Sequence, residues 1–253
     1  KLVKVGFWTL IVGCIITGLL TLSALQQSRL PKWDNIVAND SISTSQSWDY
    51  RKAVEKSRRS AVRIRSTGIG FWSSSATMTG TYFVAQGKPY VVTVHHGILG
   101  PCWLITIDHQ EAQTTCKKFI IKDKARDYVI MELEEPLPNR TPMKIPQDLP
   151  SGLHSWESSY SLLTNIIYTG YPNTLGPLTL KGSVAGYAPE EYLYVFSHAY
   201  GGASGSGIFT KDGNYIGYIV AIDVGSTEFG VDVLENIVIV APSFNVDWSA
   251  VTN

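Results

Sequence analysis

The 253-residue sequence predicts an all-β fold built from many short strands, either a barrel or a sandwich. From Ala61 onward, short apolar and β-branched runs alternate with turn residues at regular spacing, which is typical of such folds. Prolines at positions 138, 142, 146 and 150 are too many for a central strand. We therefore expect residues 137–150 to connect two separate sets of strands.

Each set divides into predicted strands. In the first set these cover residues 61–65, 80–85, 90–94, 103–108, 117–121 and 128–133, with a hairpin turn at 86–89. In the second set they cover residues 159–164, 166–171, 178–188, 192–198, 206–210, 215–223 and 236–241. Residues 48–59 predict a solvated surface helix with Ser47 as its N-cap, and residues 245–251 predict a short terminal helix.

An uncharged apolar segment precedes this region and runs from Phe7 to Leu25. A helix of that length would span most of a ~30 Å hydrocarbon layer, and Trp8 lies at one end, where interfacial aromatic residues are common. We interpret residues 1–28 as a single-pass membrane anchor, followed by a polar linker and the short helix over 29–60. The alternative is an uncleaved signal peptide. Basic residues flank both ends of the segment, so the membrane side stays open.

The overall charge and the residue types exclude some functions. The chain has 21 basic and 21 acidic residues, so its formal net charge is zero. Nucleic-acid-binding domains carry a basic patch or stripe, and we expect no nucleic-acid partner. No cluster with metal-ligand spacing stands out, so we expect neither a metal nor a cofactor. The sequence leaves the oligomeric state open.

A loop rich in glycine and serine, residues 200–209, holds the first candidate for chemistry. It contains four glycines and two serines and runs into a strand-like apolar pair. Glycine lets the backbone turn sharply and approach a ligand closely. A serine in such a loop can be presented beside backbone N–H groups, as a nucleophile and its oxyanion hole require. On its own, such a loop is more often only a turn.

Two further stretches favour the chemical interpretation. An apolar run over residues 90–94 ends on His95 and His96, and Asp127 opens the predicted strand 128–133. The order His, Asp, Ser, with each residue at a strand edge, matches one of the known chain orders of the catalytic triad.

At these residues the sequence resembles the trypsin/chymotrypsin-fold serine proteases, above all their HtrA-like, glutamyl-endopeptidase-like and viral members. Thr93-Val94-His95-His96 stands where the family has Thr-x-x-His, Asp127 begins the family's Asp-hydrophobic strand, and Gly202-Ala203-Ser204-Gly205 is its Gly-x-Ser-Gly. The resemblance covers roughly residues 61–251. It implies a protease domain over 61–253 with two six-stranded antiparallel β-barrels, about 61–140 and 150–245.

The resemblance also implies roles for single residues. Ser204 is the expected nucleophile, His96 the general base and Asp127 the residue that orients the histidine. The backbone N–H groups of Gly202 and Ser204 form the expected oxyanion hole. His95 is expected to be only a neighbour of the base.

The substrate pocket implied by the family would include His198, Ala199, Ile219 and Val220. Glutamyl endopeptidases and several viral members place a histidine at the position that Ile219 occupies, so Glu or Gln specificity is doubtful here. His198 stands toward the expected pocket base and either replaces that histidine or is structural. The cleavage specificity therefore stays open.

Cys102 and Cys116 flank a predicted hairpin centred on His109. Such a hairpin would place the two cysteines opposite each other and within disulfide reach. A disulfide would indicate an oxidising compartment, with the protease domain on the extracytoplasmic or lumenal side. Two reduced cysteines are the alternative.

Together these observations predict a membrane-anchored serine endopeptidase with a polypeptide substrate. The Gly-x-Ser-Gly-Ser form and the absence of an initiator methionine favour a protease that processes a viral polyprotein. One alternative is a cellular HtrA-like protease in quality control or secretion. Another is a catalytically silent binding protein on the same fold.

Overall fold

The structure of the protein, a computed structural model, describes residues 50–252 with a few short gaps. The gaps are residues 71–73, 110–111, 139, 148–149, 151, 173–174, 189–190 and 228–229, and the side chains at 109, 153 and 222–235 are also outside the description. The predicted anchor and linker, with the predicted N-cap Ser47, lie outside the described residues. Within those residues, no helix is both long enough and apolar enough to cross a bilayer.

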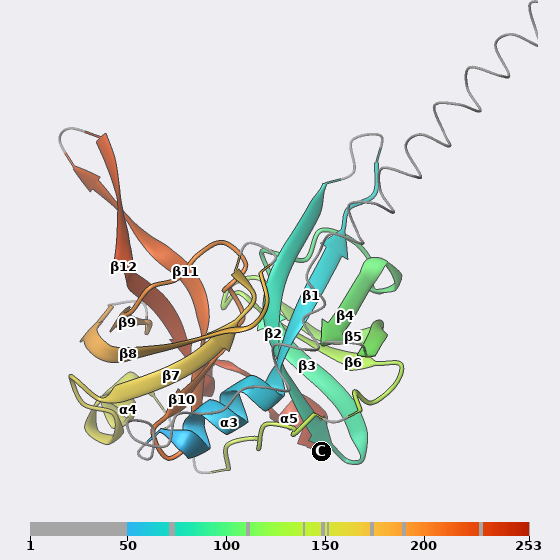
Figure 1. Ribbon diagram of the computed structural model, residues 1–253, viewed down its shortest axis with the longest axis horizontal. Coiled ribbons are helices and arrows are strands. Elements are labelled where there is room, and N and C mark those ends of the chain that lie inside the picture. Colours follow the sequence, from blue (N-terminus) through green and yellow to red (C-terminus); the bar gives the residue numbers. More distant parts are fainter. Residues whose placement is uncertain are drawn as a thin grey trace, which may run out of the picture. The chain divides into compact units, whose positions relative to one another are not determined.

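Two closed β-barrels make up the described part of the chain (Figure 1). The first closes in the order β1-β2-β3-β6-β5-β4 and the second in the order β10-β11-β12-β9-β8-β7. All the strand pairs in both barrels are antiparallel. The predicted pair of six-stranded antiparallel barrels is therefore confirmed.

The strands of the first barrel are β1 (Ala61–Thr67), β2 (Ser75–Ala85), β3 (Lys88–Val94), β4 (Ile105–His109), β5 (Ala112–Asp123) and β6 (Tyr128–Leu133). Those of the second are β7 (Asn165–Gly170), β8 (Leu178–Tyr187), β9 (Leu193–Phe196), β10 (Gly207–Thr210), β11 (Tyr215–Thr227) and β12 (Gly230–Pro242). The helical elements are α3 (Arg51–Ser60), η1 (Cys102–Leu104), α4 (Leu153–Ser159), η3 (Ser243–Asn245) and α5 (Ser249–Thr252).

Local chemistry explains the predicted hairpin between β2 and β3. Gln86 and Gly87 have φ values of 48° and 74°, and Ala85 pairs with Lys88. A two-residue turn with φ above zero at both positions matches the right-handed twist of the flanking strands. Glycine adopts this conformation without a steric penalty. The turn therefore sets the register that carries β3 toward His96.

The hydrophobic core of the first barrel continues into the second. It contains Val91 and Ile130 of the first barrel together with Phe209, Tyr215 and Tyr218 of the second, all buried. A separate cluster, which includes Ile166, Val195 and Val240, fills the second barrel. Because apolar burial is the main favourable term in folding, the shared cluster holds the two barrels together at the face where β10 and β11 lie.

The strand predicted over residues 159–164 is wrong. The helix α4 ends at Ser159, the chain then passes through a bend and a turn, and β7 begins only at Asn165. Leu162 and Leu163, which suggested a strand, are exposed, and Leu163 has a φ of 66°. The buried residue of this segment is Trp156, whose ring contacts those of Tyr160 and Tyr187.

The helix predicted as a solvated surface element packs on the second barrel instead. Ala53, Ser57 and Ser60 of α3 are buried. The Ser57 hydroxyl donates to Thr169 Oγ1 at 2.9 Å, and Lys56 Nζ donates to the Gly213 carbonyl at 2.9 Å. Figure 1 shows α3 beside the second barrel and leading directly into β1 of the first. This helix therefore links the two barrels outside their shared core.

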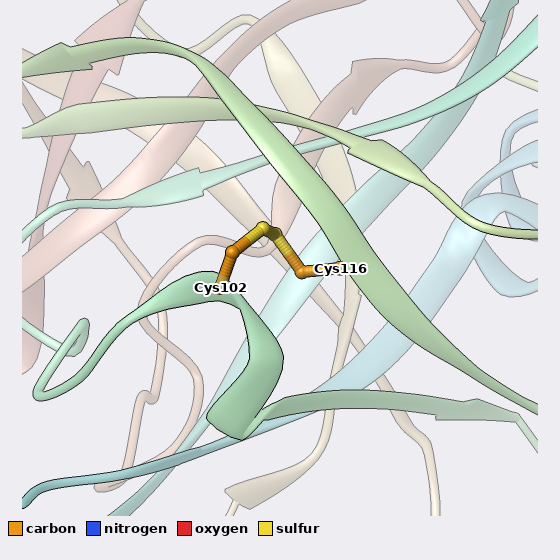
Figure 2. Close-up of a disulfide and its surroundings, with 2 residues drawn as sticks. All are labelled: Cys102 and Cys116. Carbon is orange, nitrogen blue, oxygen red and sulfur yellow. A yellow bond between two sulfur atoms is a disulfide. The ribbon is translucent and has the colours of Figure 1, made fainter.

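Cys102 and Cys116 form a disulfide, with their Cα atoms 5.1 Å apart (Figure 2). The structure joins the two predicted cysteines, but not in the hairpin register that the sequence suggested. In the β4–β5 ladder Thr106 pairs with Thr115, so the two cysteines do not face each other across the strands. Cys102 lies before β4 in the short helix η1, which brings its side chain back to β5.

We predict that Trp156→Ala lowers the free energy of unfolding by about 3–5 kcal/mol, because it opens a large cavity in the second barrel. Urea unfolding of the full chain measures the loss. Trp103→Ala is the matched control, since Trp103 is 69% exposed while Trp156 is 0% exposed. Equal losses in the two variants would contradict the assignment of Trp156 to the core.

Candidate active site

His96 lies in the turn that follows β3, two residues after its end, and contacts Asp127 twice. Its Nδ1 lies 2.7 Å from Asp127 Oδ2, and its backbone N–H donates to Oδ1 at 2.8 Å. The His96 side chain is 52% exposed, so the ring is partly open to solvent. His95 meets Asp127 only through its backbone N–H, which donates to the Asp127 carbonyl at 3.2 Å. Of the two adjacent histidines, His96 is the one with a carboxylate partner.

Asp127 lies in the turn between β5 and β6 with a φ of 52°. This left-handed conformation is uncommon outside glycine, although aspartate adopts it more readily than most residues. The hydrogen bond to Asp127 raises the pKa of His96, and this effect outweighs the opposing effect of burial. The geometry therefore favours an imidazole that carries its proton on Nδ1 and holds Nε2 free to accept another.

Ser204 lies in a tight loop. Two backbone hydrogen bonds join this loop to β11. The Gly205 N–H donates to the Ile219 carbonyl at 2.7 Å, and the Ile219 N–H donates to the Ser206 carbonyl at 3.0 Å. Gly202 and Gly205 have φ values of 98° and 85°, which favour glycine. A Cβ on Gly205 would overlap the Thr79 carbonyl of the first barrel. The glycines thus allow this loop to lie against β2.

Thr79 of β2 fixes the loop from the opposite barrel. Its hydroxyl donates to the Gly202 carbonyl at 2.7 Å and accepts from the Tyr171 N–H at 2.9 Å. Its backbone N–H donates to the Ser204 carbonyl at 2.9 Å. The Thr93 hydroxyl donates in turn to the Thr79 carbonyl at 2.7 Å. Every polar group of this fully buried residue therefore has a partner.

These contacts leave the expected oxyanion donors without protein acceptors. Among the residues that the structure describes, neither the Gly202 N–H nor the Ser204 N–H donates a hydrogen bond to the protein. The carbonyls on either side of the 203–204 peptide both point at Thr79. This peptide carries the Ser204 N–H, so the group is held in place and available to a ligand.

The two serines of the loop differ in their exposure to solvent. Ser204 is partly exposed, whereas Ser206 is fully buried. Ser206 Oγ has no hydrogen-bond partner in the described part of the chain. No hydrogen bond joins Ser204 Oγ to His96 among the described residues. Such contacts are often long before substrate binds, so the geometry selects Ser204 by access and backbone placement.

The four residues expected in the substrate pocket do not share one cavity. His198 is exposed, and its carbonyl accepts a hydrogen bond from the Tyr168 hydroxyl. It lines a cavity of about 250 Å³ with Lys181, Phe196 and Asn236, among others. Ala199 and Ile219 are buried in the second barrel, and Val220 packs against the shared core. Of the four residues, His198 is the one that lines this cavity in the described part of the chain.

The sequence interpretation missed two residues, Thr79 and Tyr218. Tyr218 of β11 is fully buried, and its hydroxyl donates to the Arg126 carbonyl at 2.8 Å. The only available signal was a polar or hydroxyl-bearing side chain inside a strand that is otherwise buried. Within the described ranges, the structure contains no group of His, Cys, Asp and Glu side chains placed to hold a metal ion.

Comparisons with known proteins identify the fold. No family model matches the chain, and no curated protein matches it. A serine endoprotease from Yersinia pestis has a TM-score of 0.57 at 16% identity, covering 77% of this chain and 62% of that one. A variant of the HtrA-type protease AlgW with a tripeptide has a TM-score of 0.57 at 16% identity, covering 76% of this chain and 59% of that one.

The chain thus spans 62% and 59% of the lengths of these two structures. At this identity the likeness shows the fold, which is chymotrypsin-like. Both similar structures are described as proteases of serine-endoprotease or HtrA type. The chemistry of this chain has to be argued from its own residues.

We predict that Thr79→Val destabilises the protein, because it leaves the part-buried Gly202 carbonyl and the buried Tyr171 N–H without this partner, and the buried group alone costs about 1–3 kcal/mol. Urea unfolding measures the loss. The matched control is Thr81→Val on the same face of β2, since strand neighbours two residues apart point the same way. Thr81 Oγ1 is buried and has no partner among the described residues, so its removal should not lower the stability and should leave it unchanged or raised. Similar losses in both variants would show that the Thr79 hydrogen bonds contribute nothing.

Proposed function

We propose that the protein is a serine endopeptidase that hydrolyses peptide bonds through Ser204, His96 and Asp127. The observation that carries the proposal is the double contact of the Asp127 carboxylate with the ring and backbone of His96. A merely structural histidine does not need a carboxylate partner on a ring that is about half exposed. This arrangement of a base and its orienting group is what activation of a hydroxyl nucleophile requires.

In the proposed reaction, Ser204 Oγ attacks the carbonyl carbon of the scissile bond while His96 Nε2 accepts the hydroxyl proton. Asp127 keeps the proton on Nδ1 and stabilises the imidazolium that forms. The imidazolium then gives its proton to the leaving amine, and the C–N bond breaks to leave an acyl-enzyme. Water attacks the ester with His96 again as the base, which releases the acid and restores the serine.

The negative charge on the carbonyl oxygen is stabilised, in this proposal, by the N–H groups of Gly202 and Ser204. Preorganised donors are effective because they need no reorganisation as the charge develops, and the loss of one donor typically costs about 3 kcal/mol in the transition state. The hydrogen bonds from Thr79 to the carbonyls of Gly202 and Ser204 support such preorganisation.

The substrate is an unfolded or extended polypeptide in this proposal, and its sequence stays open. The cavity beside His198, Lys181 and Phe196 is a candidate for part of the specificity site. Processing of a viral polyprotein is supported only by the form of the serine motif. A cellular HtrA-like protease in quality control or secretion is the alternative, and one of the structures with a similar fold is described as an HtrA-type protease. Sequencing of peptides cleaved from a library would distinguish a narrow processing specificity from a broad one.

We predict that Ser204→Ala and His96→Ala each lower turnover of a peptide substrate by about 10⁴–10⁶-fold while the protein stays folded. Labelling of Ser204 by a fluorophosphonate probe tests the same assignment directly. The controls are the neighbours of these residues, because Ser206→Ala and His95→Ala should keep most of the activity. Inactivation by Ser206→Ala with an active Ser204→Ala would reverse the assignment of the nucleophile.

A wild-type protein that the probe does not label, and that cleaves no peptide in the library, would instead support the catalytically silent alternative.

We also propose that residues 7–25 tether the protease to a membrane, with the catalytic domain on the oxidising side. The disulfide between Cys102 and Cys116 supports an oxidising compartment, since such bonds are rare in the cytosol. A spanning helix satisfies its own backbone within lipid and is not needed by a barrel core.

We predict that a chain starting at about Lys32 is soluble and as active per molecule as the full chain, whereas the full chain stays in the membrane fraction after carbonate extraction. A second truncation at Ala61 is the control, because it also removes α3 and its buried Ser57 contact with Thr169. We expect this shorter chain to be unstable. An insoluble or inactive Lys32 chain would show that the apolar segment belongs to the protease body.

A further inference from the structure

We propose that Tyr218 is a positioning residue for Asp127, reaching it across the barrel interface through the Arg126 carbonyl. The inference rests on the proposed function, because it assigns a role in holding the His96–Asp127 pair. Tyr218 belongs to β11 of the second barrel, whereas Asp127 and Arg126 lie in the β5–β6 turn of the first. The hydroxyl donates to the Arg126 carbonyl at 2.8 Å.

The hydrogen bond acts on the peptide that sets the conformation of Asp127. The Arg126 carbonyl belongs to the peptide plane that also carries the Asp127 N–H. Rotation of this plane about the N–Cα bond of Asp127 is its φ angle, which is 52° in the structure. Left-handed conformations of residues other than glycine persist only where their surroundings hold them. Tyr218 supplies such a hold from the opposite barrel.

Further contacts complete the support of this turn. The Arg126 N–H donates to Asp123 Oδ1 at 2.9 Å, which holds the same segment from the surface. The Asp127 carbonyl accepts from the His95 N–H at 3.2 Å. Both peptide planes that flank Asp127 are therefore hydrogen-bonded, and the direction of its Cα–Cβ bond is set. The carboxylate then meets the His96 ring at 2.7 Å.

The hydroxyl of Tyr218 is not explained by packing alone. The ring is fully buried in the shared core, where phenylalanine would fill nearly the same volume. Burial raises the pKa of Tyr218 well above its ordinary value, so the hydroxyl keeps its proton and remains a donor. The titratable groups that act on it are those of Tyr215, Tyr192, Asp127 and Tyr128.

The same strand provides a matched control. Tyr215 is also buried in the shared core, but its hydroxyl has no hydrogen-bond partner among the residues that the structure describes. Tyr215→Phe and Tyr218→Phe thus remove the same atom from the same core. Only the second change frees the Arg126 carbonyl. Any difference between the two variants reports on this hydrogen bond.

The test combines kinetics with the titration of His96 in the full chain. Tyr218→Phe should lower kcat by about 10- to 100-fold, as expected when a catalytic group is misplaced by a fraction of an ångström to an ångström. KM should change little, because substrate binding does not involve the turn. Tyr215→Phe should leave both parameters as in the wild type.

The pH dependence gives a readout that a purely structural role would not change. The hydrogen bond to Asp127 raises the pKa of His96 in the native protein, so the acid limb of kcat/KM should lie above about 6.5. If the Asp127 carboxylate moves away from His96, it raises the pKa of His96 by less. The acid limb of Tyr218→Phe should therefore move to lower pH, and the pKa of the His96 ring measured by NMR should fall with it.

The outcomes separate the two proposals. A His96 pKa that falls in Tyr218→Phe and not in Tyr215→Phe supports the positioning role, even if the wild-type protein cleaves nothing and the proposed function fails. An unchanged pKa and kcat in a folded Tyr218→Phe would overturn the role. If Tyr218→Phe does not fold while Tyr215→Phe does, the Tyr218 hydroxyl acts mainly on stability, and the positioning role would be overturned.

Discussion

The candidate site depends above all on the hydrogen bonds between Thr79 and the loop that carries Ser204. The expected nucleophile belongs to the second barrel, whereas His96 and Asp127 belong to the first. Thr79 crosses from the first barrel to hold the serine loop, and Tyr218 crosses from the second to hold the aspartate turn. These reciprocal contacts couple the two halves of the site, and the shared apolar core presses the barrels together around them.

The glycines of the serine loop have a second role that their sequence context did not show. A Cβ on Gly205 would overlap the backbone of Thr79, and a Cβ on Gly207 would lie 2.6 Å from Thr81 Oγ1. Gly170 of β7 is limited in the same way by Ser206 Oγ, at 2.5 Å. The loop is therefore rich in glycine partly because it packs directly against β2, and presentation of Ser204 to solvent follows from this close approach.

The sequence predicted what is local and missed what depends on distant contacts. Strand runs such as 90–94 and the Gln86–Gly87 turn follow from alternation and turn chemistry, and the His, Asp and Ser motifs lie beside them. The segment 159–164 failed because Leu162 and Leu163 are apolar but exposed, while Trp156 supplies the burial. Thr79 and Tyr218 could not be found, because their partners lie 123 and 92 residues away.

Three pairs of hydroxyl-bearing side chains at and beneath the site differ in their hydrogen bonding or their exposure. Thr79, Ser204 and Tyr218 each have a near neighbour of the same type, namely Thr81, Ser206 and Tyr215. In every pair the second hydroxyl is buried and has no hydrogen-bond partner within the described residues. Because an unpaired buried hydroxyl destabilises the folded state by about 1–3 kcal/mol, these neighbours weaken the interface, while the first members shape the site. The apolar core holds the barrels together, and the hydrogen bonds of Thr79 and Tyr218 that end on the carbonyls of Gly202, Ser204 and Arg126 fix the backbone at or beside the proposed catalytic groups.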